Sequence, residues 1–157
     1  METTDLTLIS PAELFAAVSE LLEQGYDAEF TVTGNSMWPL LRGGRDTVCL
    51  RKPKTPLKKG DIVLFSTGEE SFFLHRIKAL TADGFESLGD GNLSSDGVFS
   101  TDCVLGRVVS FQRKGKTFSC SDPWYRRSAA VWTALLPIRR PLLKLLRKIA
   151  KVHFKKK

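Results

Sequence analysis

The chain has 157 residues, of which 42% are hydrophobic and 26% are charged, so one globular domain is expected and a disordered or fibrous protein is excluded. Three widely spaced cysteines and only two histidines argue against a disulfide framework, a cysteine-based zinc site and a multi-histidine metal centre, so we expect no metal and no cofactor. The net charge of +7 is concentrated in residues 122–157, which carry eleven Lys or Arg against one acid, whereas residues 1–121 carry thirteen against sixteen.

Neither a secretory signal nor a transmembrane helix is expected. The N-terminus begins Met1-Glu2-Thr3-Thr4-Asp5, which is acidic and lacks the apolar stretch of a secretory signal. The longest nearly uncharged stretch near the C-terminus, residues 128–138, is much shorter than the ~20 residues of a transmembrane helix. We therefore expect a protein that is cytoplasmic or peripherally attached to a membrane, on a side that the sequence leaves open.

Residues 10–24 are predicted to form a helix that packs on the domain. Ser10 is a suitable N-cap, Pro11 takes the first helical position, and Glu13 completes a capping box. Apolar residues recur on one face, and Gly25 follows the end of the helix.

Residues 28–118 are predicted to form short strands, because their segments are rich in β-branched and aromatic residues and are bounded by glycine or charged turns. Short, frequent strands favour a curved or barrel-like antiparallel sheet over a βαβ fold, so the expected class is mainly β (α+β). The predicted strands cover residues 30–33, 47–50, 61–65, 72–77, 84–88, 104–111 and 117–119, with residues 66–71 as a hairpin loop.

Residues 122–157 are predicted to form a basic tail that is separate from the domain of residues 1–121. From residue 126 onward, aliphatic residues interleave with lysine and arginine in the pattern of a basic amphipathic helix. Pro137 and Pro141 are expected to divide this helix into two pieces.

Three polar clusters are candidates for chemistry. The first, Gly34-Asn35-Ser36-Met37-Trp38-Pro39, puts a serine on a stiff turn after a strand, although most such stretches are ordinary turns. The second is His75; a histidine in an apolar strand is more often structural, but neutral imidazole accepts protons near pH 7. The third is the loop Gly89-Asp90-Gly91-Asn92-Leu93-Ser94-Ser95-Asp96-Gly97, which lacks the downstream glutamate of an EF-hand loop and offers two carboxylates to orient an imidazole.

The three clusters together resemble the type I signal peptidases. The ordered motifs are Ser36-Met37-Trp38-Pro39, Leu74-His75-Arg76-Ile77, Gly89-Asp90 with Asp96 six residues later, and Gly106-Arg107-Val108-Val109, within about residues 28–112. The match is closest to the branch of the catalytic subunit of the endoplasmic-reticulum and archaeal enzyme, because the main bacterial branch has a lysine at the position of His75. The resemblance implies a coiled antiparallel β-fold and serine endopeptidase activity on signal or leader peptides.

The resemblance also implies a role for each matched residue. Ser36 would be the nucleophile and His75 the general base, while Asp96 would orient the imidazole and stabilise its charged form. Asp90 would be a second, supporting carboxylate, and Arg76 would pair with either carboxylate. A histidine base does not need the strong desolvation that keeps a lysine base neutral.

Substrate contacts and two departures from the family pattern complete the predicted site. The segment Met37-Trp38-Pro39 is expected to contact an extended peptide with small side chains before the scissile bond. Gly34 stands where the family has a hydroxyl residue that contributes to the oxyanion hole, so the Ser36 backbone N–H, helped by Asn35, would have to serve. Gly43-Gly44-Arg45-Asp46 replaces a Gly-Asp pair, so Asp46 is expected to be shifted by an insertion.

The expected partners are a peptide or preprotein substrate and a membrane surface. A basic helix within residues 126–157, with Trp124, Trp132 and Phe154, would lie in the interface, and a packing helix with a solvated basic face is the alternative. Nucleic acid is not expected, because no base-reading motif accompanies the tail. Two other functions stay open: a soluble repressor-type protease that processes itself, and a catalytically weak module that binds peptides or membranes.

Overall fold

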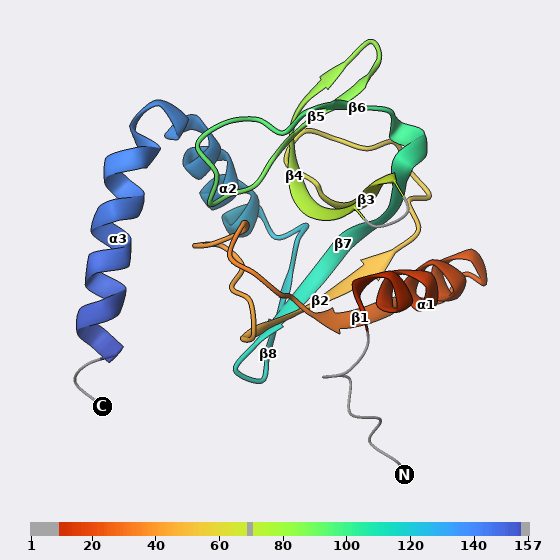
Figure 1. The fold of residues 1–157 in the computed structure, drawn as a ribbon, viewed down its shortest axis with the longest axis horizontal. Helices are drawn as coiled ribbons and strands as arrows, with labels where there is room; N and C mark the ends of the chain where they lie inside the picture. Colours follow the sequence, from red (N-terminus) through yellow and green to blue (C-terminus); the bar gives the residue numbers. More distant parts are fainter. Residues whose placement is uncertain (1–9, 69–70, 155–157) are drawn as a thin grey trace.

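An antiparallel sheet forms the centre of the protein (Figure 1). The computed structural model describes residues 10–68 and 71–154, and within them the prediction of a mainly antiparallel α+β fold is confirmed. The strands are β1 (Ala28–Thr31), β2 (Asp46–Arg51), β3 (Ile62–Gly68), β4 (Ser71–Thr81), β5 (Gly84–Leu88), β6 (Gly97–Phe99), β7 (Val104–Arg113) and β8 (Lys116–Ser119). The helices are α1 (Pro11–Glu23), α2 (Pro123–Ala134) and α3 (Arg139–Phe154), with 3-10 turns η2 (Thr101–Cys103) and η3 (Leu136–Ile138).

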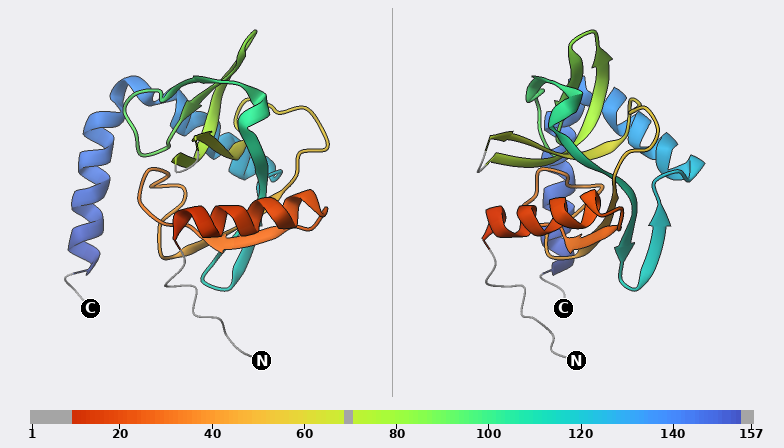
Figure 2. Two further views of the ribbon diagram at one scale, coloured as in Figure 1. Left: turned by 45° about the vertical axis from the view of Figure 1, so that its right-hand side comes forward. Right: turned by 90° about the vertical axis from the view of Figure 1, so that its right-hand side faces the viewer.

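The strands follow the order β1-β2-β7-β3-β4-β5-β6, and β8 also pairs with β7. The long strand β7 joins the two halves of the sheet, because β2 pairs along residues 107–113 and β3 along residues 104–107. Irregularities at Cys49/Leu50 and Leu64/Phe65 bend the strands near this junction. The sheet is strongly curved, and α1 covers one part of it (Figure 2).

Several strand predictions differ from the structure: β1 ends at Thr31 and not at residue 33, and β4 continues to Thr81 and does not end at residue 77. Strand β6 was not predicted, since only three residues form it and its pairing with residues 85–87 of β5 depends on backbone contacts rather than on side-chain alternation. The predicted loop of residues 66–71 is shorter, because β3 continues to Gly68 and β4 already begins at Ser71. Pairing of Phe65 and Ser66 with the apolar start of β4 extends the hairpin.

Helix α1 occupies the segment that was predicted as helix and covers one core cluster. The Ser10 hydroxyl accepts a hydrogen bond from the Glu13 backbone N–H, and the Glu13 carboxylate accepts one from the Ser10 N–H, which forms the capping box. Leu22 lies so close to β7 that a Cβ on Gly106 would be 2.9 Å from the Leu22 Cδ1 atom. This first cluster comprises Val18, Leu22, Ala28, Val32, Met37, Leu41, Val48, Leu50, Ile62, Leu64, Val108 and Phe111; a second comprises Val63, Phe65, Ile77 and Phe85.

The segment after residue 121 has two parts that pack differently. Helix α2, which follows the domain boundary expected at residue 121, lies on the body of the protein with Ala129 and Trp132 buried. Helix α3 extends past the body, and Arg139 and Leu143 of its first turns are buried (Figure 1). Pro137 lies between the two helices, in η3, but Pro141 lies in the first turn of α3 and does not interrupt it. No helix of the described residues has the length and apolarity required to cross a bilayer.

Candidate active site

A cleft of about 450 Å³ contains three of the predicted site residues, Ser36, His75 and Asp96. They come from the turn after β1, from the middle of β4 and from the loop between β5 and β6, so the fold brings together residues far apart in the sequence. The rest of the lining is mainly apolar and consists of Pro11, Leu14, Phe15, Val18, Phe30, Val32, Thr33, Met37, Leu64, Phe72, Phe73, Leu74 and Asn92.

The turn that carries Ser36 is held by close backbone contacts. Gly34 has a φ of 73°, and a Cβ on Gly43 would lie 2.2 Å from the Gly34 carbonyl oxygen, so both positions require glycine. On the other side, the Gly91 N–H donates to the Ser36 carbonyl at 2.7 Å. Within the described residues, neither the Ser36 hydroxyl nor its backbone N–H has a hydrogen-bond partner, which leaves both groups available to a ligand in the cleft.

The His75 imidazole is oriented by Asp96. The distance between His75 Nδ1 and Asp96 Oδ2 is 2.7 Å, and the two side chains are 5% and 18% exposed. The same Asp96 oxygen accepts a hydrogen bond of 2.7 Å from the hydroxyl of the buried Ser87. Because Nδ1 is engaged by the carboxylate, Nε2 is the ring nitrogen that can exchange a proton with a group in the cleft.

Arg76 and Asp90 form a buried ion pair that does not line the cleft. Two guanidinium nitrogens contact the two Asp90 oxygens at 2.8 and 2.7 Å, and Arg76 also donates to the Gly60 carbonyl and the Tyr125 hydroxyl. Burial acts to lower the pKa of Arg76, but Asp90 and Tyr125 together raise it above its ordinary value. Neighbouring residues of β4 therefore serve two different environments, with His75 in the cleft and Arg76 against α2.

The C-terminal segment holds the loop that carries both carboxylates. The Trp132 indole N–H donates to the Asp90 carbonyl at 2.7 Å. The fully buried Arg139 donates to the carbonyls of Asn92, at 3.0 Å, and Trp132, at 2.9 Å. Sequence reasoning did not identify the contacts to Asp90 and Asn92, because they join residues more than 40 positions apart and carry no local pattern.

The remaining predicted site residues differ in whether they line the cleft. Met37 is buried and lines the cleft. Trp38 and Pro39, joined by a cis peptide bond, and the exposed Asn35 are not among the lining residues. The backbone of this turn instead packs on the carboxylate loop, since a Cβ on Gly91 would lie within 3 Å of the Asn35 and Trp38 carbonyl oxygens. Asn92 lines the cleft, and its position in the chain gave no signal for this role.

Asp46 anchors the loop that follows the Ser36 turn. Its carboxylate is fully buried and accepts hydrogen bonds from Arg45, from Arg113 and from the Arg42 backbone N–H. Arg113 also donates to the Leu40 carbonyl. Burial acts to raise the pKa of Asp46, but these donors outweigh it and hold the pKa well below its ordinary value.

We expect the anchoring by Asp46 to be lost in acid. Because its pKa is lower in the folded state, the stabilisation is complete above about pH 4 and declines as the pH falls below that value. The free energy of unfolding of the wild type, measured with urea, should therefore fall between pH 5 and pH 2.5 by about 1–2 kcal/mol more than that of Asp46→Asn. Asp83→Asn, at an exposed turn, should keep the wild-type pH dependence, and equal slopes for the wild type and Asp46→Asn would contradict the anchoring role.

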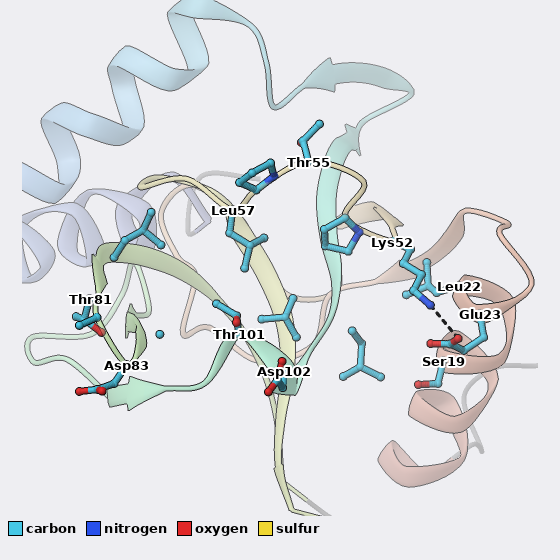
Figure 3. Close-up of a pocket in the computed structure, with 17 residues that line it drawn as sticks. Ser19, Leu22, Glu23, Lys52, Thr55, Leu57, Thr81, Asp83, Thr101 and Asp102 are labelled. Atoms are coloured by element: carbon cyan, nitrogen blue, oxygen red, sulfur yellow. Dashed lines mark hydrogen bonds and ion pairs between the residues drawn. The ribbon is translucent and has the colours of Figure 1, made fainter.

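A larger cavity, of about 840 Å³, lies away from the three cleft residues (Figure 3). It is bounded by α1, the segment after β2, the β4–β5 turn and η2, and a 2.8 Å ion pair between Lys52 and Glu23 lies at one end. Neither Ser36, His75 nor Asp96 lines it. The smaller cleft is therefore the candidate active site.

No protein-family model matches the chain, and no curated protein matches it.

Proposed function

We propose that the protein is a serine endopeptidase of the signal-peptidase type, with Ser36 as nucleophile, His75 as general base and Asp96 as the carboxylate that orients the base. The observation that carries this proposal is the 2.7 Å contact between His75 Nδ1 and Asp96 Oδ2 in the cleft that Ser36 also lines. A serine hydroxyl becomes an effective nucleophile only when a base removes its proton during attack. The cleft supplies such a base and the group that orients it.

In the proposed reaction, the Ser36 Oγ atom bonds to the scissile carbonyl carbon while His75 Nε2 takes the hydroxyl proton. Asp96 stabilises the resulting imidazolium through Nδ1. His75 then gives the proton to the leaving amine as the C–N bond breaks, and an acyl-enzyme forms on Ser36. Water, activated by the same imidazole, hydrolyses the ester and restores the free hydroxyl.

The oxyanion of the tetrahedral intermediate needs a donor close to Ser36. The Ser36 backbone N–H has no acceptor within the described residues. It is the donor we assign to the oxyanion, because the Asn35 side chain, which was predicted to help, is exposed and does not line the cleft. Loss of one such donor in serine proteases lowers the rate by roughly 10²–10³-fold.

The substrate is proposed to bind as an extended strand between two walls of the cleft. Within the described residues, β1 pairs only with β2, and residues 72–75 of β4 pair only with β3, because pairing with β5 begins at Arg76. Both strands contribute lining residues to the cleft, so unpaired backbone groups lie next to it. A signal or leader peptide with small side chains before the scissile bond is the substrate class that the family resemblance suggests.

An active-site-directed fluorophosphonate tests the proposal without knowledge of the natural substrate. The wild type should be labelled at Ser36, as identified by mass spectrometry of the modified peptide, and Ser36→Ala should not be labelled. His75→Ala should react at least about 100-fold more slowly, since the base is lost. Ser121→Ala, at an exposed serine, is the matched control and should react as the wild type does. Labelling at another serine, or equal labelling of His75→Ala, would contradict the assignment and favour a module that only binds peptides.

A further inference from the structure

Helix α3 presents an apolar stripe to solvent. The stripe consists of Leu142, Leu145, Ile149 and Val152, which recur at intervals of three or four residues and so share one face of the helix. Leu145, Ile149 and Val152 are 54%, 49% and 53% exposed. Leu143, on another face, is buried against the body, so the side that packs and the side that carries the stripe are different.

A basic row runs along α3 beside the apolar stripe. It consists of Arg140, Lys144, Arg147, Lys148 and Lys151, and all five side chains are exposed. Lys148 follows Leu145 by three residues and precedes Val152 by four, which places it directly beside the stripe. Within residues 10–68 and 71–154, none of these five cations forms an ion pair with an acidic side chain.

We propose that α3 binds the surface of a membrane that contains anionic lipids, with the apolar stripe inserted at the level of the headgroups and the lysines of the basic row facing them. An interfacial helix requires both features, a solvent-exposed apolar face and cations along its border. A second copy of the chain would bring a like-charged row toward this one, and nucleic acid would leave the stripe in water. The proposal goes beyond the peptidase reaction and does not depend on it.

The structure also limits which part of the C-terminal segment takes part. Trp132, predicted to lie in the interface, is buried and donates to the Asp90 carbonyl, so it is not available to lipid. Trp124 is exposed, and the side chain of Phe154 lies outside the described residues. The membrane-binding surface is therefore assigned to α3, whose first residue, Arg139, is fixed to the body.

Co-sedimentation of the full chain with vesicles tests this assignment. We expect binding to vesicles of equal parts phosphatidylcholine and phosphatidylglycerol, and much weaker binding to phosphatidylcholine alone. Lys144→Gln/Lys148→Gln/Lys151→Gln should weaken binding to the vesicles that contain phosphatidylglycerol by on the order of 100-fold. Leu145→Glu/Ile149→Glu should reduce it at least as much, because it removes the inserted side chains and adds negative charge.

Matched controls separate the surface of α3 from general charge and exposure. Leu80→Glu/Val98→Glu changes two exposed apolar residues of the sheet, and Lys54→Gln/Lys58→Gln/Lys116→Gln removes three exposed lysines elsewhere; both should bind as the wild type does. Circular dichroism and urea unfolding check that every variant is folded. The proposal is overturned if the α3 variants bind vesicles as the wild type does. It is also overturned if the protein does not bind anionic vesicles but binds a short DNA duplex tightly, and if Leu145→Glu/Ile149→Glu binds that duplex equally well.

Discussion

Replacement of Ser36 or His75 by alanine is expected to abolish peptide cleavage, and Asp96→Ala to lower kcat by about 10⁴-fold. Without Ser36 there is no hydroxyl to form the acyl-enzyme, and without His75 the hydroxyl keeps its proton. Without Asp96 the imidazole loses the acceptor that engages Nδ1 at 2.7 Å and is free to present the wrong tautomer to the serine. A fluorogenic peptide with alanine before the scissile bond measures these losses.

The losses of turnover in the single variants should not be additive. Because the three residues act on one proton transfer, the Ser36→Ala/His75→Ala double variant should be no slower than either single variant. Ser94→Ala, an exposed hydroxyl in the same loop as Asp96, is the matched control and should retain wild-type kcat. Wild-type turnover in Asp96→Ala, with the variant folded as judged by urea unfolding, would remove Asp96 from the mechanism.

Asp90→Ala is expected to act mainly on stability rather than on turnover. The Arg76 guanidinium is buried, and its two contacts with Asp90 compensate for the cost of that burial. Removing the carboxylate leaves a buried charge without its partner, which typically costs about 3–5 kcal/mol of the free energy of unfolding. In the folded protein, kcat should fall much less than in Asp96→Ala, since Asp90 does not line the cleft.

Urea unfolding of four proteins tests the role of this ion pair. Arg76→Met/Asp90→Leu, which removes both charges, should be more stable than Asp90→Ala, because no unpaired charge remains. Glu23→Ala breaks the exposed ion pair with Lys52 and should cost no more than about 1 kcal/mol. If the free energy of unfolding of Asp90→Ala lies within about 1 kcal/mol of the wild-type value, the buried pair does not stabilise the fold as expected.

The fold class was accessible from the sequence for local physical reasons, and three cleft residues were accessible through the resemblance of their motifs to a known family. Strand segments are recognisable by their β-branched and aromatic content, and the capping box at Ser10 marks the start of α1. Ser36, His75 and Asp96 stand in ordered motifs, and the structure places all three in one cleft. The peptidase activity itself remains a proposal.

The contacts that support the cleft were not accessible, because they arise only when distant segments meet. The pairing of Arg76 with one of the two carboxylates was predicted, and Arg76 does contact Asp90, but this pair lies at the interface with α2 and not in the cleft. Ser87 reaches Asp96 only through the register of β5 with the following loop. A short strand such as β6 and a buried arginine such as Arg139 have no periodic pattern that would distinguish them from loop and surface residues.

The docking of α2 has a consequence for the smallest fragment that can fold. A chain that ended at residue 121 would lose the indole and guanidinium donors of Trp132 and Arg139 and leave the carbonyls of Asp90 and Asn92 without them. Residues 91–94 would also lose the side chains of α3 with which they line one cavity. We therefore expect the autonomous folding unit to end beyond Arg139, and limited proteolysis to trim the chain within α3 before it cuts α2.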